Sequence, residues 1–230
     1  MPQKNCIKTY YENGFYHVYN RGVEKRNIFL DRDDYLAFLH LLKTSLTPLA
    51  RQGTTLTEVD ILASKTNRPR RKNFFGQLDL LSYCLMPNHF HLLVRQHGPL
   101  SLSKFMRTIC TSYSMYFNKK YDRVGSLFQG IFKAVDIDNE NYFLWVSRYI
   151  HRNPENFQSY QYSSYDDYLG KRKTTWLNTK TILDMFSSSD LKKAKNYQNF
   201  VESESEDPID LNYLLIENEI EPTRQYRVEP

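Results

Sequence analysis

Two histidines, His89 and His91, stand two residues apart in the stretch "YCLMPNHFHLLVRQ", residues 83–96. The stretch is mostly apolar and includes Leu-Leu-Val, which is typical of a β-strand. Side chains alternate between the two faces of a strand, so residues i and i+2 point the same way. The pattern predicts two imidazoles on one face, which either bind a divalent metal ion together or are hydrogen-bonded within the structure.

A catalytic metal ion usually needs a further protein ligand and an open position. The segment "NENYFLWVSRYIHRNP", residues 139–154, predicts a helix with Asp138 as its N-cap and Pro154 at its end. Tyr149 and Asn153 are four residues apart and therefore share a helical face. Beside the two histidines, they would place a nucleophilic phenol next to a metal ligand. Alternatively, Tyr149 packs in the core and Asn153 caps the helix end.

The remaining elements follow from hydrophobic periodicity and turn signals. Strands are predicted over 14–22 and 126–137, helices over 31–46 (with Asp31 as N-cap) and 100–121, and a hairpin or two strands over 75–96. The order β-α-β(β)-α-β-α predicts an α+β fold. We expect a ferredoxin-like antiparallel sheet with helices packed on one face, plus a C-terminal extension.

Composition narrows the class of protein. The 230 residues are 40% hydrophobic, which suffices for one sizeable domain. Three widely spaced cysteines without a CxxC pair argue against a disulfide framework or a cysteine zinc site, and they predict a cytoplasmic location. No apolar run approaches the roughly 18 residues of a membrane span, so we expect no membrane association.

The charge is unevenly distributed. Residues 201–230 hold nine acidic and two basic side chains, a net charge of −7, whereas residues 1–200 hold 29 basic and 17 acidic side chains, a net charge of +12. A basic body with an acidic tail predicts a polyanionic partner for the body. The alternative is a solvated surface followed by a disordered tail.

Four stretches carry a resemblance to a known family. "MPNHFHLLV" (86–94) resembles the His-hydrophobe-His motif of HUH single-strand DNA endonucleases, and "YIHRNP" (149–154) resembles the tyrosine helix of single-tyrosine transposases. "YHVYNRG" (16–22) and "GSLFQGIFKA" (125–134) resemble the same family. Over roughly residues 12–165, the chain therefore resembles HUH-superfamily single-tyrosine transposases, in particular the REP-associated tyrosine transposases.

The resemblance implies a role for each matching residue. His89, His91 and Asn153 would bind Mg²⁺ or Mn²⁺, and Tyr149 would attack DNA to form a 5′-phosphotyrosine. The base that deprotonates the tyrosine stays open, with His17 and His151 as candidates. Residues 1–168 would form the nuclease domain, interrupted by a long insertion over 47–73, and residues 169–230 a C-terminal extension with the acidic tail. The partner would be single-stranded or hairpin DNA, bound by a monomer or a homodimer.

The basic body supplies candidate DNA contacts. Phosphates would be bound by cations and unpaired bases stacked on aromatic rings: Arg21, Arg107, Lys119, Lys120, Arg123 and Lys133 for the phosphates, and Tyr116 and Tyr121 for the bases. Phe117 is expected to lie in the core. The acidic tail is expected to compete with DNA for the basic surface.

Two other functions fit parts of the pattern. A non-catalytic nucleic-acid binder on a ferredoxin-like sheet needs no histidine pair, so metal-dependent strand cleavage would exclude it. A metal-dependent phosphoesterase would use water in place of Tyr149, so a covalent protein–DNA adduct would exclude that alternative.

Overall fold

The computed structural model describes residues 10–48, 72–187 and 189–204. Within these ranges, four strands form one sheet in the order β2-β3-β1-β4, and each neighbouring pair is antiparallel. The strands are β1 (Phe15–Arg21), β2 (Leu78–Met86), β3 (His89–Gln96) and β4 (Lys133–Ile137). The predicted α+β class with a ferredoxin-like antiparallel sheet is confirmed. Most of the predicted insertion and of the acidic tail lies outside the described residues.

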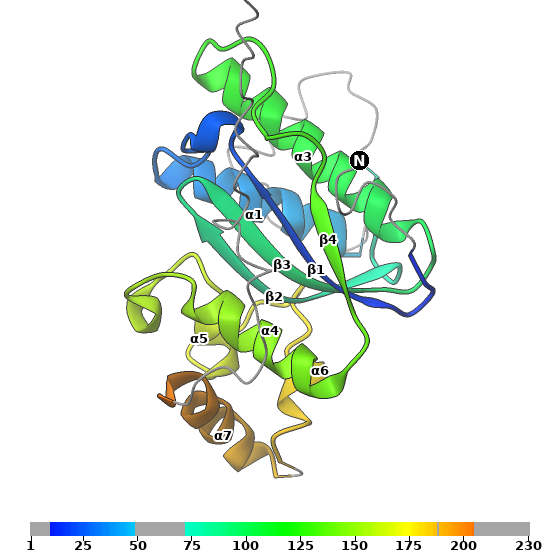
Figure 1. Ribbon diagram of the computed structural model, residues 1–230, viewed down its shortest axis with the longest axis vertical. Coiled ribbons are helices and arrows are strands. Elements are labelled where there is room, and N and C mark those ends of the chain that lie inside the picture. Colours follow the sequence, from blue (N-terminus) through cyan, green and yellow to red (C-terminus); the bar gives the residue numbers. More distant parts are fainter. Residues whose placement is uncertain (1–9, 49–71, 188, 205–230) are drawn as a thin grey trace, which may run out of the picture.

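Two long helices cover one face of the sheet: α1 (Arg32–Leu46) and α3 (Ser101–Lys120) (Figure 1). The predicted N-cap of α1 is confirmed, because Asp31 and Asp34 form a reciprocal capping box. Phe90 and Leu92 of β3 point into the core on this side, where both are fully buried. These two helices therefore lie on one face, as predicted.

The other face of the sheet is also covered by helices, and here the prediction of a single covered face was wrong. The helices on this side are α4 (Glu140–Arg152), α5 (Tyr165–Tyr168), α6 (Lys180–Leu183) and α7 (Asp190–Glu202) (Figure 1). Leu93 of β3 points to this side and packs in a second core with Val146 and Ile150 of α4. Leu81 and Cys84 of β2 are buried on this side as well, so the sheet presents apolar side chains on both faces and each face needs a cover.

Two predicted boundaries differ from the structure. Asn139, rather than Asp138, caps α4, since its side chain accepts hydrogen bonds from the backbone N–H groups of residues 141 and 142. The strand predicted over 126–137 is shorter, because β4 begins only at Lys133. Before it, Gly125 and Gly130 adopt left-handed backbone conformations, with φ of 98° and 73°, which break an extended strand. Two short 3₁₀ turns, η1 (Val23–Lys25) and η3 (Phe157–Ser159), complete the fold.

The C-terminal extension packs against the outer side of α4. The buried guanidinium of Arg148 donates to the backbone oxygen of Ser203 at 2.6 Å and lies 4.7 Å from the ring centroid of Trp145. One turn further on, Nδ1 of His151 lies 2.8 Å from the hydroxyl of Tyr197 in α7. Helix α4 is therefore held between the sheet and α7.

Replacing Arg148 with Ala is expected to lower the free energy of unfolding by about 2–4 kcal/mol, because it removes charged hydrogen bonds and buried packing together. Urea denaturation followed by circular dichroism measures the change. Arg152→Ala is the matched control, because the exposed Arg152 donates to the same Ser203 oxygen at 3.0 Å. We expect that control to cost less than about 1 kcal/mol. Equal effects of the two substitutions would contradict this role of Arg148.

Candidate metal and nucleophile site

The β2–β3 hairpin holds the two histidines in place. Pro87 lies in the turn of this hairpin, and its backbone oxygen accepts hydrogen bonds from the N–H groups of Ile28 and Phe29. These bonds tie the turn to the segment that follows β1. His89 and His91 point to the α4 side, with ring centroids 5.0 Å apart. His89 is half-buried and His91 is fully buried. The strand alternation therefore places both imidazoles on one face.

Helix α4 brings Tyr149 and Asn153 to these histidines. The rings of Tyr149 and His91 meet edge to face, with centroids 5.3 Å apart, and Asn153 Oδ1 lies 3.0 Å from His89 Nε2. Asn153 keeps a helical backbone (φ −55°, ψ −41°) although a proline follows it. Its side chain therefore stays on the face of the helix that carries Tyr149.

Both ring nitrogens of His89 face amide oxygens. Asn88 Nδ2 donates to the backbone oxygen of Lys25, which turns Asn88 Oδ1 toward His89 Nδ1 at 2.6 Å. Nε2 of His89 faces Asn153 Oδ1 at 3.0 Å. In the tautomer with its proton on Nδ1, His89 would present the lone pair of Nε2 on the side of Asn153, where the two side chains would hold a cation together.

His91 also offers a lone pair to the same place. Its Nε2 is buried and has no hydrogen-bond partner among the described residues. Burial, followed by the neighbouring His89 and His17, holds the pKa of His91 well below its ordinary value, so the ring is uncharged at neutral pH. Uncharged imidazole is the form that binds a metal ion. The three side chains therefore fit a divalent ion.

The side chain that joins the histidine pair is an amide rather than a carboxylate. Among the described residues, no group of three His, Cys, Asp or Glu side chains is arranged to hold a metal ion. The oxygen of Asn153 is the candidate third ligand, because it lies beside His89 Nε2. Two imidazoles and one amide oxygen suit Mn²⁺ at least as well as Mg²⁺, because Mn²⁺ accepts nitrogen ligands more readily.

Comparison with known proteins places this site within a recognised family segment. The stretch 72–153 matches the family described as "Transposase IS200 like". Residues 72–153 form an IS200-transposase-like segment. It begins just before β2 and ends at Asn153, so it includes both histidines and Tyr149. The resemblance noted in the sequence is confirmed over this stretch.

The chain was also compared with curated proteins and with solved structures. None of the curated proteins compared with the chain matches it. A solved structure described as "Structure of the REP associates tyrosine transposase bound to a REP hairpin" is similar at 14% sequence identity and a TM-score of 0.49, over 74% of this chain and 87% of that chain.

Two of the predicted DNA-binding cations lie on the same sheet face as the histidines of the IS200-like segment. Arg21 is opposite His89 in the β1–β3 pairing, and Lys133 is opposite Tyr19 in the β1–β4 pairing. Arg21 Nε donates to Gln129 Oε1 at 2.6 Å, which orients its guanidinium. Burial and the charge of Arg21 lower the pKa of Lys133. Arg21 and Lys133 therefore lie on the sheet face that carries the histidine pair.

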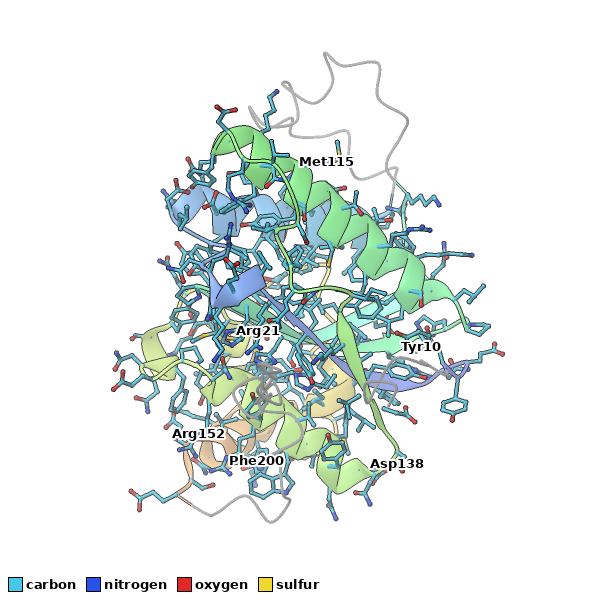
Figure 2. All side chains as sticks on the ribbon, turned by 45° about the horizontal axis from the view of Figure 1, so that its top comes forward. Tyr10, Arg21, Met115, Asp138, Arg152 and Phe200 are labelled. Carbon is cyan, nitrogen blue, oxygen red and sulfur yellow. The ribbon has the colours of Figure 1, made fainter. Side chains whose placement is uncertain are left out.

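The other predicted DNA contacts lie on or just after α3, in the layer on the far side of the sheet. Arg107 and Lys119 are exposed on that helix. Figure 2 shows Met115 of α3 well apart from Arg21. Arg123 donates to Asn118 and lies over the ring of Phe117, which is buried as expected.

Three of these α3-layer residues are tied to the start of α1. The hydroxyls of Tyr116 and Tyr121 donate to the buried carboxylate of Asp34, at 3.1 and 2.8 Å. The ammonium of Lys120 bridges Asp34 and Asp31 at 2.9 and 2.7 Å. These bonds hold α1 and α3 together, and they keep the two phenols in place within the protein.

The two candidate bases have different surroundings. His151 is fully buried on the far side of α4, between Tyr197 and Ser164. It therefore does not face Tyr149 and the histidine pair. His17 lies within the site, with its Nε2 2.8 Å from His91 Nδ1. The sequence analysis did not identify Tyr19, whose ring packs beside the rings of His17 and His91. The alternation in "YHVYNRG" was the available signal, since His17, Tyr19 and Arg21 share one face of β1.

Proposed function

We propose that the protein is a metal-dependent single-strand DNA endonuclease and transposase that cleaves and rejoins DNA through a 5′-phosphotyrosine. The observation that carries the proposal is the meeting of Tyr149 and Asn153 of α4 with the histidine pair of β3. The match of residues 72–153 to the IS200-like transposase family supports the same function. We assign the nuclease to residues 1–168 and treat residues 169–230 as an extension.

The residue types dictate the proposed chemistry. His89, His91 and Asn153 would hold a Mg²⁺ or Mn²⁺ ion, which when bound would supply positive charge to offset the negative charge of the scissile phosphate. The phenol oxygen of Tyr149 attacks phosphorus and loses its proton, while the bond from phosphorus to the 3′ oxygen breaks and that oxygen leaves as a 3′-hydroxyl. Attack by a 3′-hydroxyl reverses the step and restores the phenol, so rejoining needs no ATP.

The general base for Tyr149 is not assigned to either candidate histidine. The burial of His17 lowers its pKa to about 3, which makes the ring a poor proton acceptor. His151 is buried away from Tyr149, and burial likewise lowers its pKa to about 3. Positive charge near the phenol would stabilise the phenolate and so favour loss of the proton, and a cation held by His89, His91 and Asn153 would supply that charge.

We propose single-stranded or hairpin DNA as the partner. Arg21 and Lys133 lie where they can hold the phosphate beside Tyr149, and the exposed cations of α3 can bind the rest of the strand. None of the described helices has the length and apolar character needed to cross a membrane. Three further points stay predictions: that the protein acts as a monomer or a homodimer, that it is cytoplasmic, and that its acidic tail competes with DNA.

The exposed cations of α3 are expected to set part of the salt dependence of DNA binding. Each phosphate contact to a single strand contributes about 0.7 to the slope of log K against log salt. Changing both Arg107 and Lys119 to Gln should therefore reduce the slope by about 1.4. Fluorescence anisotropy across a salt series measures it. Lys195→Gln, an exposed cation on α7, is the control and should leave the slope unchanged. If the double variant keeps the wild-type slope, Arg107 and Lys119 of α3 do not contact the DNA.

One assay separates the proposed function from its rivals. The full chain is incubated with labelled hairpin DNA carrying single-stranded flanks, in EDTA and in Mn²⁺, and resolved on a denaturing gel. We expect cleavage and a covalent protein–DNA band only with Mn²⁺. Cleavage without a covalent band would indicate attack by water. Binding without cleavage under any metal condition would indicate a non-catalytic binder.

A further inference from the structure

His17 lies in direct contact with both halves of the proposed site. It is fully buried, and its Nε2 is 2.8 Å from Nδ1 of His91, with the two rings stacked at 16° and 5.0 Å between centroids. The ring of Tyr149 meets it edge-on, with centroids 5.9 Å apart. One side chain of β1 therefore contacts a proposed metal ligand and the proposed nucleophile.

The hydrogen bond between the two rings has only two arrangements. Both rings are fully buried, and a neutral imidazole carries one proton, which makes one of its nitrogens a donor and the other an acceptor. If His91 donates through Nδ1, its Nε2 keeps a lone pair for a metal ion. If His17 donates instead, the proton of His91 has to lie on Nε2, and His91 loses its ability to bind the ion. The direction of this one hydrogen bond therefore decides whether His91 is a ligand.

We propose that His17 is a positioning residue that accepts a hydrogen bond from His91 Nδ1 and so fixes the tautomer and ring orientation in which His91 Nε2 binds the metal ion. The inference rests on the proposed function, because it presumes that His91 is a ligand. Partners of this kind commonly hold metal-binding histidines in place. In this arrangement the proton of His17 lies on Nδ1, which is buried and has no partner among the described residues.

That orphaned nitrogen argues against a role in packing alone. A buried polar atom without a partner is unfavourable, and such atoms call for an explanation other than stability. An apolar side chain at position 17 would remove the orphaned atom while filling the same core. The histidine is therefore explained by what it does for His91.

The first test measures the tautomer of His91 in the metal-free full chain by ¹H–¹⁵N NMR of the histidine rings. We expect the Nδ1–H tautomer in the wild-type protein. In His17→Leu, the acceptor is gone and His91 should lose its preference for Nδ1–H. Finding the Nε2–H tautomer in the wild type would overturn the proposal, and so would an unchanged tautomer in His17→Leu.

The second test measures Mn²⁺ affinity by isothermal titration calorimetry. His17→Leu is expected to bind Mn²⁺ about 10–100-fold more weakly, the usual cost of losing a partner of a ligand histidine. His17→Gln is the conservative control, because its amide oxygen can accept the same hydrogen bond and should restore most of the affinity. The metal-free melting temperature of each variant reports folding, and His17→Phe replaces the Leu variant if that one does not fold.

The outcomes distinguish this inference from the proposed function. Wild-type affinity in a folded His17→Leu or His17→Phe protein would overturn the role of His17 and leave the metal site intact. A wild-type protein that binds no Mn²⁺ would overturn the metal site and, with it, the role of His17. Weak binding by the apolar variant together with recovery by His17→Gln would support the proposal.

Discussion

Tyr149→Phe is expected to abolish DNA cleavage and adduct formation, by a factor on the order of 10³ or more, while the protein still folds and binds DNA. The substitution removes one hydroxyl group, and the ring can still pack against His91 and His17. Cleavage of labelled hairpin DNA in Mn²⁺ measures the activity, and fluorescence anisotropy measures binding.

Tyr142→Phe is the matched control, because it removes a phenol from the same helix two turns earlier and should leave cleavage intact. Tyr19 is the other phenol that packs beside His91, with ring centroids 5.9 Å apart. A covalent adduct formed by the Tyr149→Phe protein would mean that another tyrosine is the nucleophile, and Tyr19 would be the first to examine.

His91→Ala and His89→Ala are each expected to weaken Mn²⁺ binding and DNA cleavage together. Loss of a ligand should cost at least as much as the roughly 10–100-fold that follows loss of a ligand's hydrogen-bond partner. Excess Mn²⁺ should restore part of the cleavage, because mass action compensates for weaker binding. Calorimetry and the cleavage assay, run on the same samples, test whether the two quantities change in step.

His97→Ala is the control for the histidine pair. His97 follows the opposite end of β3 and pairs with Asp79 at 3.1 Å, so its removal should change neither metal binding nor cleavage. Wild-type cleavage by His89→Ala or His91→Ala at low Mn²⁺ would mean that the pair serves only the structure.

The sequence correctly predicted the relative placement of side chains that are only a few residues apart in the chain. The i, i+2 spacing of His89 and His91 on a strand, and the i, i+4 spacing of Tyr149 and Asn153 on a helix, each depend on a few consecutive residues. Such spacings follow from backbone geometry alone. The order of elements then sufficed for the ferredoxin-like sheet, because a β-α-β-β-α-β order is the pattern of that fold, whose strands here lie in the order β2-β3-β1-β4.

The features that the sequence did not predict depend on distant pairings. The bond from His17 to His91 spans 74 positions, and the bond from Tyr121 to Asp34 spans 87. Neither leaves a periodic signal. The second helical layer was missed for a similar reason, because an apolar strand does not reveal which helix covers each of its faces.

The most direct test of the central claim is to locate the covalent bond between protein and DNA. The full chain is incubated with hairpin DNA and Mn²⁺, trimmed with nuclease, digested with trypsin and analysed by mass spectrometry. Cleavage after Arg148 and Arg152 isolates the four residues from Tyr149 to Arg152. We predict that this peptide carries the mass of a 5′-phosphorylated nucleotide on its tyrosine. An adduct on any other tyrosine, or cleaved DNA with no adduct at all, would contradict the assignment of Tyr149 as the nucleophile.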